Sequence, residues 1–415
     1  MPTSYPKSKI RALLLEGVHT SAAAALRAEG YSVEALSGAP EPAALASLLK
    51  DVHLVGIRSK TELTGDLLAA APRLLAVGCF CIGTNQVDVG AARRRGVPVF
   101  NSPFSNTRSV AELTMAEVIS LHRRLADKSA QMHRGVWDKS AAGAHEVRGR
   151  TLGIVGYGHI GSQVSVLAEA MGMRVVFHDV VPRMALGNAR ACKTLGDLLK
   201  EADVVTLHVP STRETRGLIG AAQIKRMKPG SYLINNARGS VVDVRALAEA
   251  LGAGHLSGAA LDVFPDEPAG QSEAFATPVQ GLANVILTPH VGGSTSEAQA
   301  AIAGDVSEKL LRFVNVGSTT GAVNVPEVEL PEQSHPVAGP GKRPHRVLHF
   351  HRNVPGVLST MHSLIAGLGA NISAEYLRTS EDVGYVVLDV DPTDGAKVLR
   401  ALQGVPETIR VRLLW

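Results

Sequence analysis

The chain has 415 residues, 45% apolar and 19% charged, which is typical of a globular protein with two or three domains. Lysine and arginine (42) exceed aspartate and glutamate (38) by only four, and no basic stripe is interleaved with aromatic residues, so we expect no nucleic-acid partner. No apolar run is long enough to span a membrane, the N-terminus lacks a signal-peptide core, and three cysteines are too few for a disulfide framework, so we expect a cytoplasmic protein.

Strands and helices alternate through the first hundred residues. Apolar strands are predicted at 10–15, 31–36, 52–57, 74–77 and 97–100, and Ala- or Leu-rich helices at 21–29, 43–49 and 89–95. This order predicts βα units on a parallel sheet. The segment has no glycine-rich phosphate motif, so its role is not to hold a dinucleotide. A long helix is predicted at 107–124, followed by a stretch of charged and small residues that contains Trp137 and Lys139.

A glycine motif follows the next predicted strand, Leu152–Val155. Gly156, Gly158 and Gly161 have the spacing G-x-G-x-x-G, an amphipathic helix comes next, and a second strand, Arg174–His178, ends at Asp179. The first glycine permits the turn, the second allows a pyrophosphate near the backbone, and the third lets the helix pack closely. An acid at the end of the second strand is suited to the adenosine ribose hydroxyls, and it disfavours a 2′-phosphate by charge. We therefore predict a doubly wound domain that binds NAD rather than NADP.

Strands are also predicted at 204–208, 231–235, 259–262 and 285–287, and three of them lead to chemically useful side chains. Arg238, Glu267 and His290 each follow a predicted strand, and Gly292 and Gly293 beside the histidine allow close approach. Parallel strands gather their carboxyl ends at one edge of a sheet. We expect Glu267 to hydrogen-bond to His290 and raise its pKa. Arg238 is suited to a carboxylate, so the three indicate interconversion of a 2-hydroxy acid and a 2-keto acid. Taken singly, a surface ion pair, a helix cap and a turn are ordinary alternatives.

Two residue pairs have fragments of a metal-ligand pattern. Cys79 and Cys81 alternate along a predicted strand without a second cysteine pair, and His349 and His351 share a strand face without an evident third ligand. Because protein metal sites use three or four protein ligands, we expect no metal.

A separate C-terminal module is predicted after residues 326–343, which are rich in Pro and Gly and indicate a linker. The order of elements is then strand 346–350, a helix through Leu358 and Leu368, strands 372–377 and 385–390, helix 396–402 and strand 409–414. This βαββαβ order is ferredoxin-like. The module has no nucleophile or phosphate loop, so it is either a dimerisation element or a sensor of a small ligand.

The chain resembles the D-2-hydroxyacid dehydrogenase family, in the form that carries a C-terminal ACT domain and acts on 3-phosphoglycerate. The resemblance covers nearly the whole length. It rests on Gly156–Gly161 with Asp179, Asn235-x-x-Arg238-Gly, Asp262 to Pro268 and Thr288-Pro-His290, and on the more specific stretches 57–61, 78–85 and 101–112.

The resemblance implies three domains and a full set of site residues. It implies a flavodoxin-like substrate domain (1–103, with 293–325 returning to it), a Rossmann domain (104–292), a linker (326–343) and an ACT domain (344–415). The family assigns catalysis to Arg238, Glu267 and His290, and its contacts with NAD match His159, Ile160, Asp179, Ala237, Arg238, Asp262 and His290. Substrate contacts match Arg58, Ser59, Lys60, Asn106 and, across subunits, Lys139, whereas serine contacts match His351, Asn353 and Asn371.

The activity implied by the resemblance is NAD-dependent oxidation of 3-phosphoglycerate in a homotetramer inhibited by L-serine. Lys60 stands where an arginine is usual, so any phosphate contact there is that of a point charge. The linker is also longer than usual. A hydroxypyruvate or glyoxylate reductase remains an alternative, and a non-enzymatic NAD-sensing protein is a second one. The intact Arg/Glu/His set argues against the latter.

Overall fold

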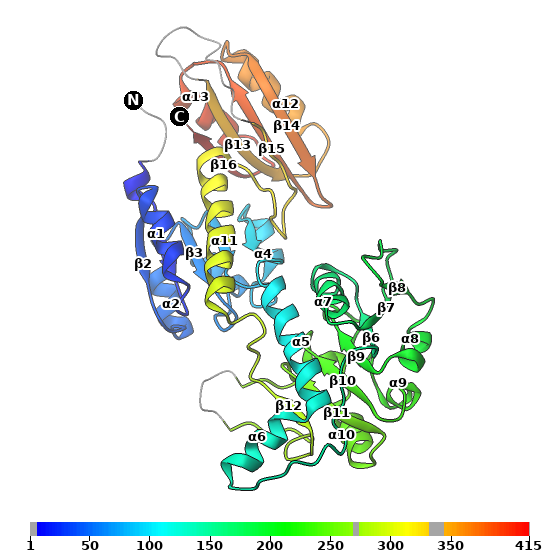
Figure 1. Cartoon of the computed structure of the whole chain (residues 1–415). Helices are drawn as coiled ribbons and strands as arrows, with labels where there is room; N and C mark the ends of the chain where they lie inside the picture. Colours follow the sequence, from blue (N-terminus) through cyan, green and yellow to red (C-terminus); the bar gives the residue numbers. More distant parts are fainter. Residues whose placement is uncertain (1–5, 269–273, 332–343, 415) are drawn as a thin grey trace. The chain divides into compact units, whose positions relative to one another are not determined.

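The computed structural model describes residues 6–268, 274–331 and 344–414, and the chain forms two compact units (Figure 1). Unit 1 contains the chain up to Ser105 and from Gln299 onward, and unit 2 contains Asn106–Ala298. The domain boundaries expected after residues 103 and 292 lie a few residues from these points.

Unit 1 begins with a five-stranded parallel sheet. After a short 3₁₀ turn, η1 (Lys7–Lys9), the strands are β1 (Arg11–Leu14), β2 (Ser32–Ala35), β3 (Leu54–Ile57), β4 (Ala76–Cys79) and β5 (Val99–Asn101). Their spatial order is β2-β1-β3-β4-β5, which is the flavodoxin-like order. The predicted fold class of this part is therefore confirmed.

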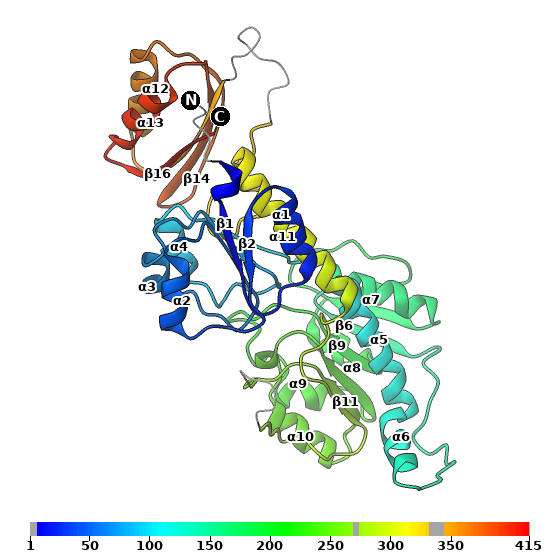
Figure 2. The same cartoon turned by 90° about the vertical axis from the view of Figure 1, so that its left-hand side faces the viewer.

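Helices cover both faces of this sheet because apolar side chains alternate along its strands. On one face, Ala12 and Leu14 pack with α1 (Thr20–Ala28) and with the returning helix α11 (Ser296–Val316). On the other, Leu13 and Leu15 pack with α2 (Pro42–Leu49), α3 (Gly65–Ala69) and α4 (Val89–Arg94). Figure 2 shows these two groups of helices on opposite sides of the strands.

Unit 2 opens with two consecutive helices where one was predicted. Helix α5 (Thr107–Arg123) ends at Arg124, which has a left-handed backbone (φ 50°), and α6 (Leu125–His133) follows directly. Helix α6 buries none of its residues. We did not predict it because we recognised helices by the periodic apolar residues of a buried face. Asp127 holds its first turn, because its carboxylate pairs with Arg124 at 3.2 Å and accepts the Asn284 N–H at 2.9 Å.

The seven-stranded parallel sheet of unit 2 has the doubly wound arrangement. Its strands are β6 (Thr151–Val155), β7 (Arg174–His178), β8 (Arg190–Ala191), β9 (Val204–Leu207), β10 (Ser231–Asn235), β11 (Leu256–Leu261) and β12 (Val285–Leu287), in the order β12-β11-β10-β9-β6-β7-β8. Helices α5 and α7 (His159–Ala170) pack on one face, and α8 (Leu195–Glu201), α9 (Ala221–Arg226) and α10 (Val244–Gly252) on the other. A 3₁₀ turn, η2 (Gly239–Val241), follows β10.

The C-terminal module of unit 1 is a four-stranded antiparallel sheet with two helices on one face. It comprises β13 (His345–Arg352), α12 (Val357–Gly367), β14 (Ile372–Thr379), β15 (Val383–Val390), α13 (Gly395–Gln403) and β16 (Thr408–Leu414), with the strand order β14-β15-β13-β16. This βαββαβ topology confirms the predicted ferredoxin-like class. Its uncovered sheet face is apolar too, and Phe350 and Tyr385 there join the core that contains Phe313 of α11.

The predicted linker begins later than residue 326. The Thr319 N–H donates to the Val328 carbonyl at 2.9 Å, and Thr319 Oγ1 accepts the Val328 N–H at 2.8 Å and donates to the Pro326 carbonyl at 2.7 Å. Val328 is buried in the unit 1 core. Glu327 and Glu329 on either side of Val328 are exposed. Buried and exposed residues therefore alternate here as in a strand, a pattern that the neighbouring prolines obscured in the sequence. The remainder, residues 332–343, lies outside the described residues.

Candidate active site

The glycine motif between β6 and α7 has the geometry that a dinucleotide site requires. Gly156 has φ 92°, and a Cβ there would lie 2.5 Å from the His208 carbonyl oxygen. A Cβ at Gly161 would collide with the Gly156 carbonyl, whereas a Cβ at Gly158 would meet no atom within 4 Å. The open space at Gly158, the N-cap residue of α7, is where a pyrophosphate can approach the helix N-terminus, with His159 and Ile160 in its first turn.

Asp179 follows β7 and holds the glycine loop in place. Its Oδ2 accepts the Tyr157 N–H at 2.8 Å, and its Oδ1 accepts the Val181 N–H at 2.9 Å. Arg183 pairs with the same carboxylate at 3.5 Å. The residue predicted to receive the ribose hydroxyls therefore also supports the phosphate loop, and a cation stands beside it.

Three neighbouring strands deliver the predicted catalytic residues. Asn235 at the end of β10 pairs with Leu261 of β11, which pairs with Leu287 of β12, and Arg238, Glu267 and His290 follow these positions. Gly239 lets the chain after Arg238 touch the Phe264–Pro265 backbone, because a Cβ there would collide with Phe264. The three loops are thereby held together at the carboxyl edge of the sheet.

His290 and Glu267 form the expected hydrogen bond. His290 Nδ1 lies 2.8 Å from Glu267 Oε2, and the other carboxylate oxygen accepts the Phe264 N–H at 3.1 Å. Because a carboxylate accepts, Nδ1 donates, and Nε2 of the 51% exposed His290 side chain is left for a substrate.

The surrounding charges favour the protonated form of His290. The hydrogen bond to Glu267 raises the pKa of His290, against opposition from burial and from the charge of Arg238. Burial raises the pKa of Glu267, but the hydrogen bonds from His290 and Phe264 outweigh it, and the net shift is downward. The charge of Arg238, which follows the neighbouring strand β10, lowers both pKa values.

Asp262 shapes the loop that carries His290. Its Oδ1 accepts from Thr288 Oγ1 at 2.6 Å and from the Val291 N–H at 2.8 Å, and its Oδ2 accepts the Gly292 N–H at 2.7 Å. His290 itself has φ 55°, a backbone conformation that costs energy in a non-glycine residue. Three hydrogen bonds to one carboxylate maintain that conformation.

The predicted substrate residues are divided between the two units. In unit 2, Asn106 packs against Gly293, and its buried Oδ1 has no partner in the described structure. Lys139 is exposed in the segment after α6. Ala237, a predicted NAD contact, is buried next to Arg238 in the chain. In unit 1, Arg58, Ser59 and Lys60 form the loop after β3. Glu16, with φ 60°, holds that loop by accepting the N–H groups of Arg58, Lys60 and Thr61 at 2.8 to 3.1 Å.

The support that Glu16 gives to the predicted substrate loop is a feature that we did not predict. Glu16 follows β1, which is the neighbour of β3 in the sheet. The feature of the sequence that could have indicated its role is an acid at the end of a parallel strand. A single glutamate before glycine gives no such indication until the strand order is known.

The predicted effector residues lie at opposite ends of the C-terminal sheet. His351 is at the end of β13, and Asn353 beyond it donates to the Ser380 carbonyl at 2.8 Å, just after β14. Asn371 precedes β14, beside the far end of β15, where Asp391 N–H donates to its carbonyl. The structure does not bring Asn371 to the other two within one module.

Neither metal nor membrane features were found within the described residues. No group of three His, Cys, Asp or Glu side chains there is arranged to hold a metal ion. In the same part of the chain, no helix is long and apolar enough to cross a membrane.

Comparisons with known proteins agree with this fold. Residues 115–292 match the model of the D-isomer specific 2-hydroxyacid dehydrogenase NAD-binding domain, and residues 347–410 match the AHAS small subunit-like ACT domain. The chain therefore belongs to the D-2-hydroxyacid dehydrogenase family, and it is an NAD-dependent oxidoreductase with a C-terminal ACT domain.

Within this family its relatives include D-3-phosphoglycerate dehydrogenases. The chain is 51% identical to that of Escherichia coli over 415 residues and 50% identical to that of Haemophilus influenzae over 413, covering 99% of each chain in both cases. Among solved structures, D-lactate dehydrogenase from Aquifex aeolicus complexed with NAD and lactic acid is 30% identical with a TM-score of 0.66, over 76% of this chain and 100% of that one.

Proposed function

We propose that the protein oxidises 3-phospho-D-glycerate to 3-phosphohydroxypyruvate with NAD, as the first step of phosphorylated serine biosynthesis. The observation that supports this most is the His290–Glu267 pair beside Arg238, at the strand ends of a dinucleotide fold. The choice of substrate is supported by relatives at about 50% identity, which are D-3-phosphoglycerate dehydrogenases.

The chain's own residues account for binding and proton transfer. Arg238 binds the substrate carboxylate, and neutral His290 removes the hydroxyl proton through Nε2 while the C2 hydride leaves. NAD supplies the acceptor for that hydride. The hydroxyl carbon becomes a carbonyl, and the proton remains on His290, where Glu267 stabilises the imidazolium.

The phosphate end of the substrate is assigned to basic residues. Arg58 and Lys60 share the loop held by Glu16, and the resemblance adds Lys139 from another subunit. A phosphate with about two negative charges is suited to such a group. Asn106 and Ser59 complete the predicted contacts.

The test compares substrates with and without the phosphate. We expect kcat/KM for 3-phosphoglycerate to exceed that for glycerate by orders of magnitude, and Arg58→Gln to narrow the ratio. Equal kcat/KM for both substrates would instead favour the hydroxypyruvate or glyoxylate reductase alternative. Arg245→Gln, an exposed arginine on α10, is the matched control.

We also propose L-serine as an inhibitor bound between two ACT modules. His351 is buried, its Nδ1 donates to the Arg352 carbonyl at 3.0 Å, and its Nε2 has no partner in the described structure. This acceptor suits the ammonium or hydroxyl of serine. β14 is an edge strand, and antiparallel pairing of β14 with its counterpart in a second copy would place that copy's Asn371 beside Ser380 and Asn353.

We further propose that the protein is a homotetramer, because exposed apolar residues on and after α6 offer a second surface for contact between copies. Leu125, Met132, Val136 and Trp137 are large apolar residues exposed on and after α6, and Trp137 is 74% exposed. Such a patch is typical of a protein interface. We also propose a cytoplasmic location, which suits Cys79, Cys81 and Cys192 because none of them is in a disulfide among the described residues. Sedimentation of the parent protein and of Trp137→Ser tests the interface.

A further inference from the structure

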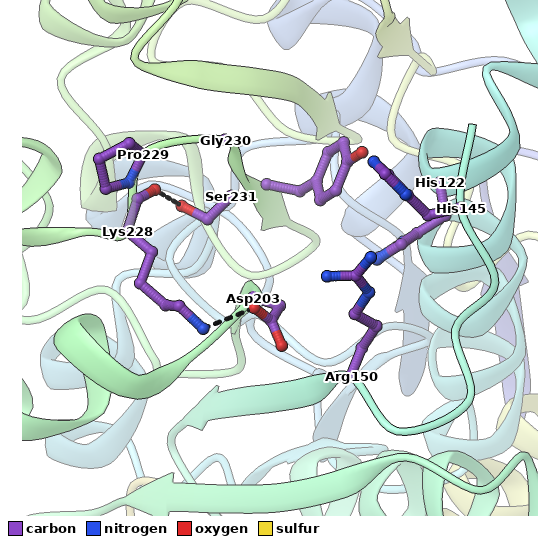
Figure 3. A pocket seen from close by; sticks show the side chains of 9 residues that line it. His122, His145, Arg150, Asp203, Lys228, Pro229, Gly230 and Ser231 are labelled. Atoms are coloured by element: carbon purple, nitrogen blue, oxygen red, sulfur yellow. Dashed lines mark hydrogen bonds and ion pairs between the residues drawn. The ribbon is translucent and has the colours of Figure 1, made fainter. Parts of the chain in front are cut away.

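A polar cavity opens at the edge of the unit 2 sheet where strands begin, whereas the catalytic residues follow strand ends. Arg150 precedes β6, Asp203 precedes β9, and Lys228–Tyr232 leads into β10; His122 and His145 complete the lining. In Figure 3, Arg150 and the two histidines lie on one side of the cavity, and Lys228 and Asp203 on the other. Its volume is about 90 Å³, enough for a small polyatomic ion.

The cavity has an excess of positive charge. Asp203 is already engaged, because its Oδ1 accepts from Lys228 Nζ at 2.6 Å and its Oδ2 accepts the Thr151 N–H at 2.8 Å. Arg150 forms no ion pair with any described residue. The mouth continues into a wider basin lined by Arg148, Arg174 and Glu146. Four cationic side chains therefore face two carboxylates, of which Asp203 is neutralised by Lys228.

His122 adds a buried acceptor to this basic surface. Its side chain is only 1% exposed, and its Nδ1 lies 2.8 Å from the Val118 carbonyl, which can only accept. The Nδ1 proton is thereby assigned, and Nε2 is a lone pair with no partner among the described residues. Burial lowers the pKa of His122, so this acceptor persists at neutral pH.

A ligand for this cavity must carry negative charge for Arg150 and a donor for His122. Water would satisfy His122 but leave Arg150 without a counter-ion, and a fully deprotonated anion would satisfy only the arginine. Hydrogen phosphate has both anionic oxygens and a P–OH group.

We propose that this cavity binds a protonated phosphate group, either inorganic phosphate or a small phosphate monoester. The site is separate from the catalytic edge of the same sheet, so it is occupied independently of NAD. It does not depend on the proposed substrate.

The test is a calorimetric titration of the full chain with inorganic phosphate, glycerol 3-phosphate and sulfate. It uses a background of Arg58→Gln, Lys60→Gln and Lys139→Gln, which removes the three basic residues assigned to the substrate phosphate. We expect saturable phosphate binding in this background. Sulfate, which has no proton to donate at neutral pH, should bind about tenfold more weakly. Binding of glycerol 3-phosphate as well as phosphate would mean that esters enter; binding of phosphate alone would restrict the site to the free ion.

Substitutions at two cavity residues, Arg150 and His122, separate the cavity from general charge effects. Arg150→Gln should weaken phosphate binding about tenfold or more, whereas Arg150→Lys should retain most of it and Arg245→Gln all of it. His122→Phe, which keeps a ring beside Tyr232, should abolish the preference for phosphate over sulfate. Circular dichroism and thermal unfolding check that each variant folds. Absence of phosphate binding in the background variant, or equal affinity in folded Arg150→Gln, would overturn the proposal.

Discussion

In the proposed reaction, the protonation state of His290 sets how the rate depends on pH, with opposite signs for oxidation and reduction. Oxidation of a hydroxy acid needs the neutral imidazole and reduction of a keto acid needs the protonated one. Because the hydrogen bond to Glu267 raises the pKa of His290, neutral imidazole becomes dominant only above the ordinary value of 6.5.

The first prediction concerns this pair. In the oxidation direction, kcat/KM should rise with pH through the raised pKa of His290, and in reduction it should fall. Glu267→Gln removes the carboxylate, lowers the pKa of His290 and shifts both midpoints to lower pH. His290→Ala should lower kcat by roughly 10²–10⁴. The measurement is a pH–rate profile in both directions.

Glu249→Gln, an exposed substitution on α10, is the control and should leave the midpoint unchanged. A His290→Ala enzyme with near-parent turnover would show that another group transfers the proton.

The second prediction concerns Asp179 and its partner Arg183. Asp179→Ala removes the predicted ribose acceptor and leaves Arg183 without its carboxylate, so the preference for NAD over NADP should narrow by about tenfold or more. Adding Arg183→Gln should remove the gain in NADP use. The measurement is kcat/KM with each cofactor.

Asp179→Asn separates charge from loop support, because the amide oxygen still accepts the Tyr157 N–H. The charge argument would be wrong if the parent enzyme preferred NADP, or if Asp179→Asn left the cofactor ratio unchanged.

At the scale of elements, a buried acid joins α5 to the end of β10. Glu117 is 3% exposed, and its Oε2 accepts from Asn236 Nδ2 at 2.6 Å, just before the Arg238 loop; Asn236 also donates to Thr114 Oγ1 at 3.0 Å. Burial raises the pKa of Glu117 to about 8, with a smaller contribution from Asp262 and against the effect of the Asn236 hydrogen bond.

The third prediction follows from the sign of this shift. Between pH 4.5 and about 8 the folded chain keeps a proton on Glu117 that the unfolded chain releases. The free energy of unfolding should therefore decrease as pH rises through this window, by an amount on the order of a few kcal/mol. Glu117→Gln should remove that decrease. Denaturant unfolding at pH 5 and pH 8 measures it, and identical pH dependence in parent and variant would contradict a protonated Glu117.

The C-terminal module is joined to the rest of unit 1 by buried polar contacts as well as by apolar ones. Arg346 pairs with Asp389 at 2.7 Å and donates to the carbonyls of Val316, Leu330 and Pro331 at 2.9 to 3.2 Å. Tyr385 donates to the Gly317 carbonyl at 2.7 Å. β13 thus runs from these contacts at Arg346 to the proposed effector residue His351.

The fourth prediction, at the scale of the whole molecule, concerns serine. Serine should inhibit with a coupling of roughly 1–3 kcal/mol, a several-fold to hundredfold effect. Asn353→Ala and Asn371→Ala should each remove inhibition with little change in basal turnover. Because the proposed serine site takes its two asparagines from different modules, mixed oligomers of the two variants should regain a fraction of sites with intact residues. The measurement is a serine titration at fixed substrate.

The control is Asn188→Ala, which changes an amide in unit 2 and should leave serine inhibition intact. If saturating serine neither inhibits nor binds in calorimetry, the module serves assembly alone.

The amino-acid sequence by itself determined the class of each sheet and the residues that follow the strands. Short stretches of sequence are enough to recognise the apolar periodicity, the spacing of the three glycines of the motif, and Asp179 at the end of a strand. This is because turn geometry and strand alternation are local properties. The same local logic predicted that Glu267 and His290 meet, since parallel strands bring their carboxyl ends together.

Only the tertiary structure decided features that depend on residues far apart in the chain. Helix α6 has no buried face to mark it, Val328 extends the core into a segment rich in proline, and Glu16 acts on a loop that follows another strand. The proton on Glu117 and the acceptor on His122 depend on burial and on the hydrogen bonds that neighbours make or leave unmade. Burial and pairing are sums over the whole fold, so no local pattern of residues encodes them.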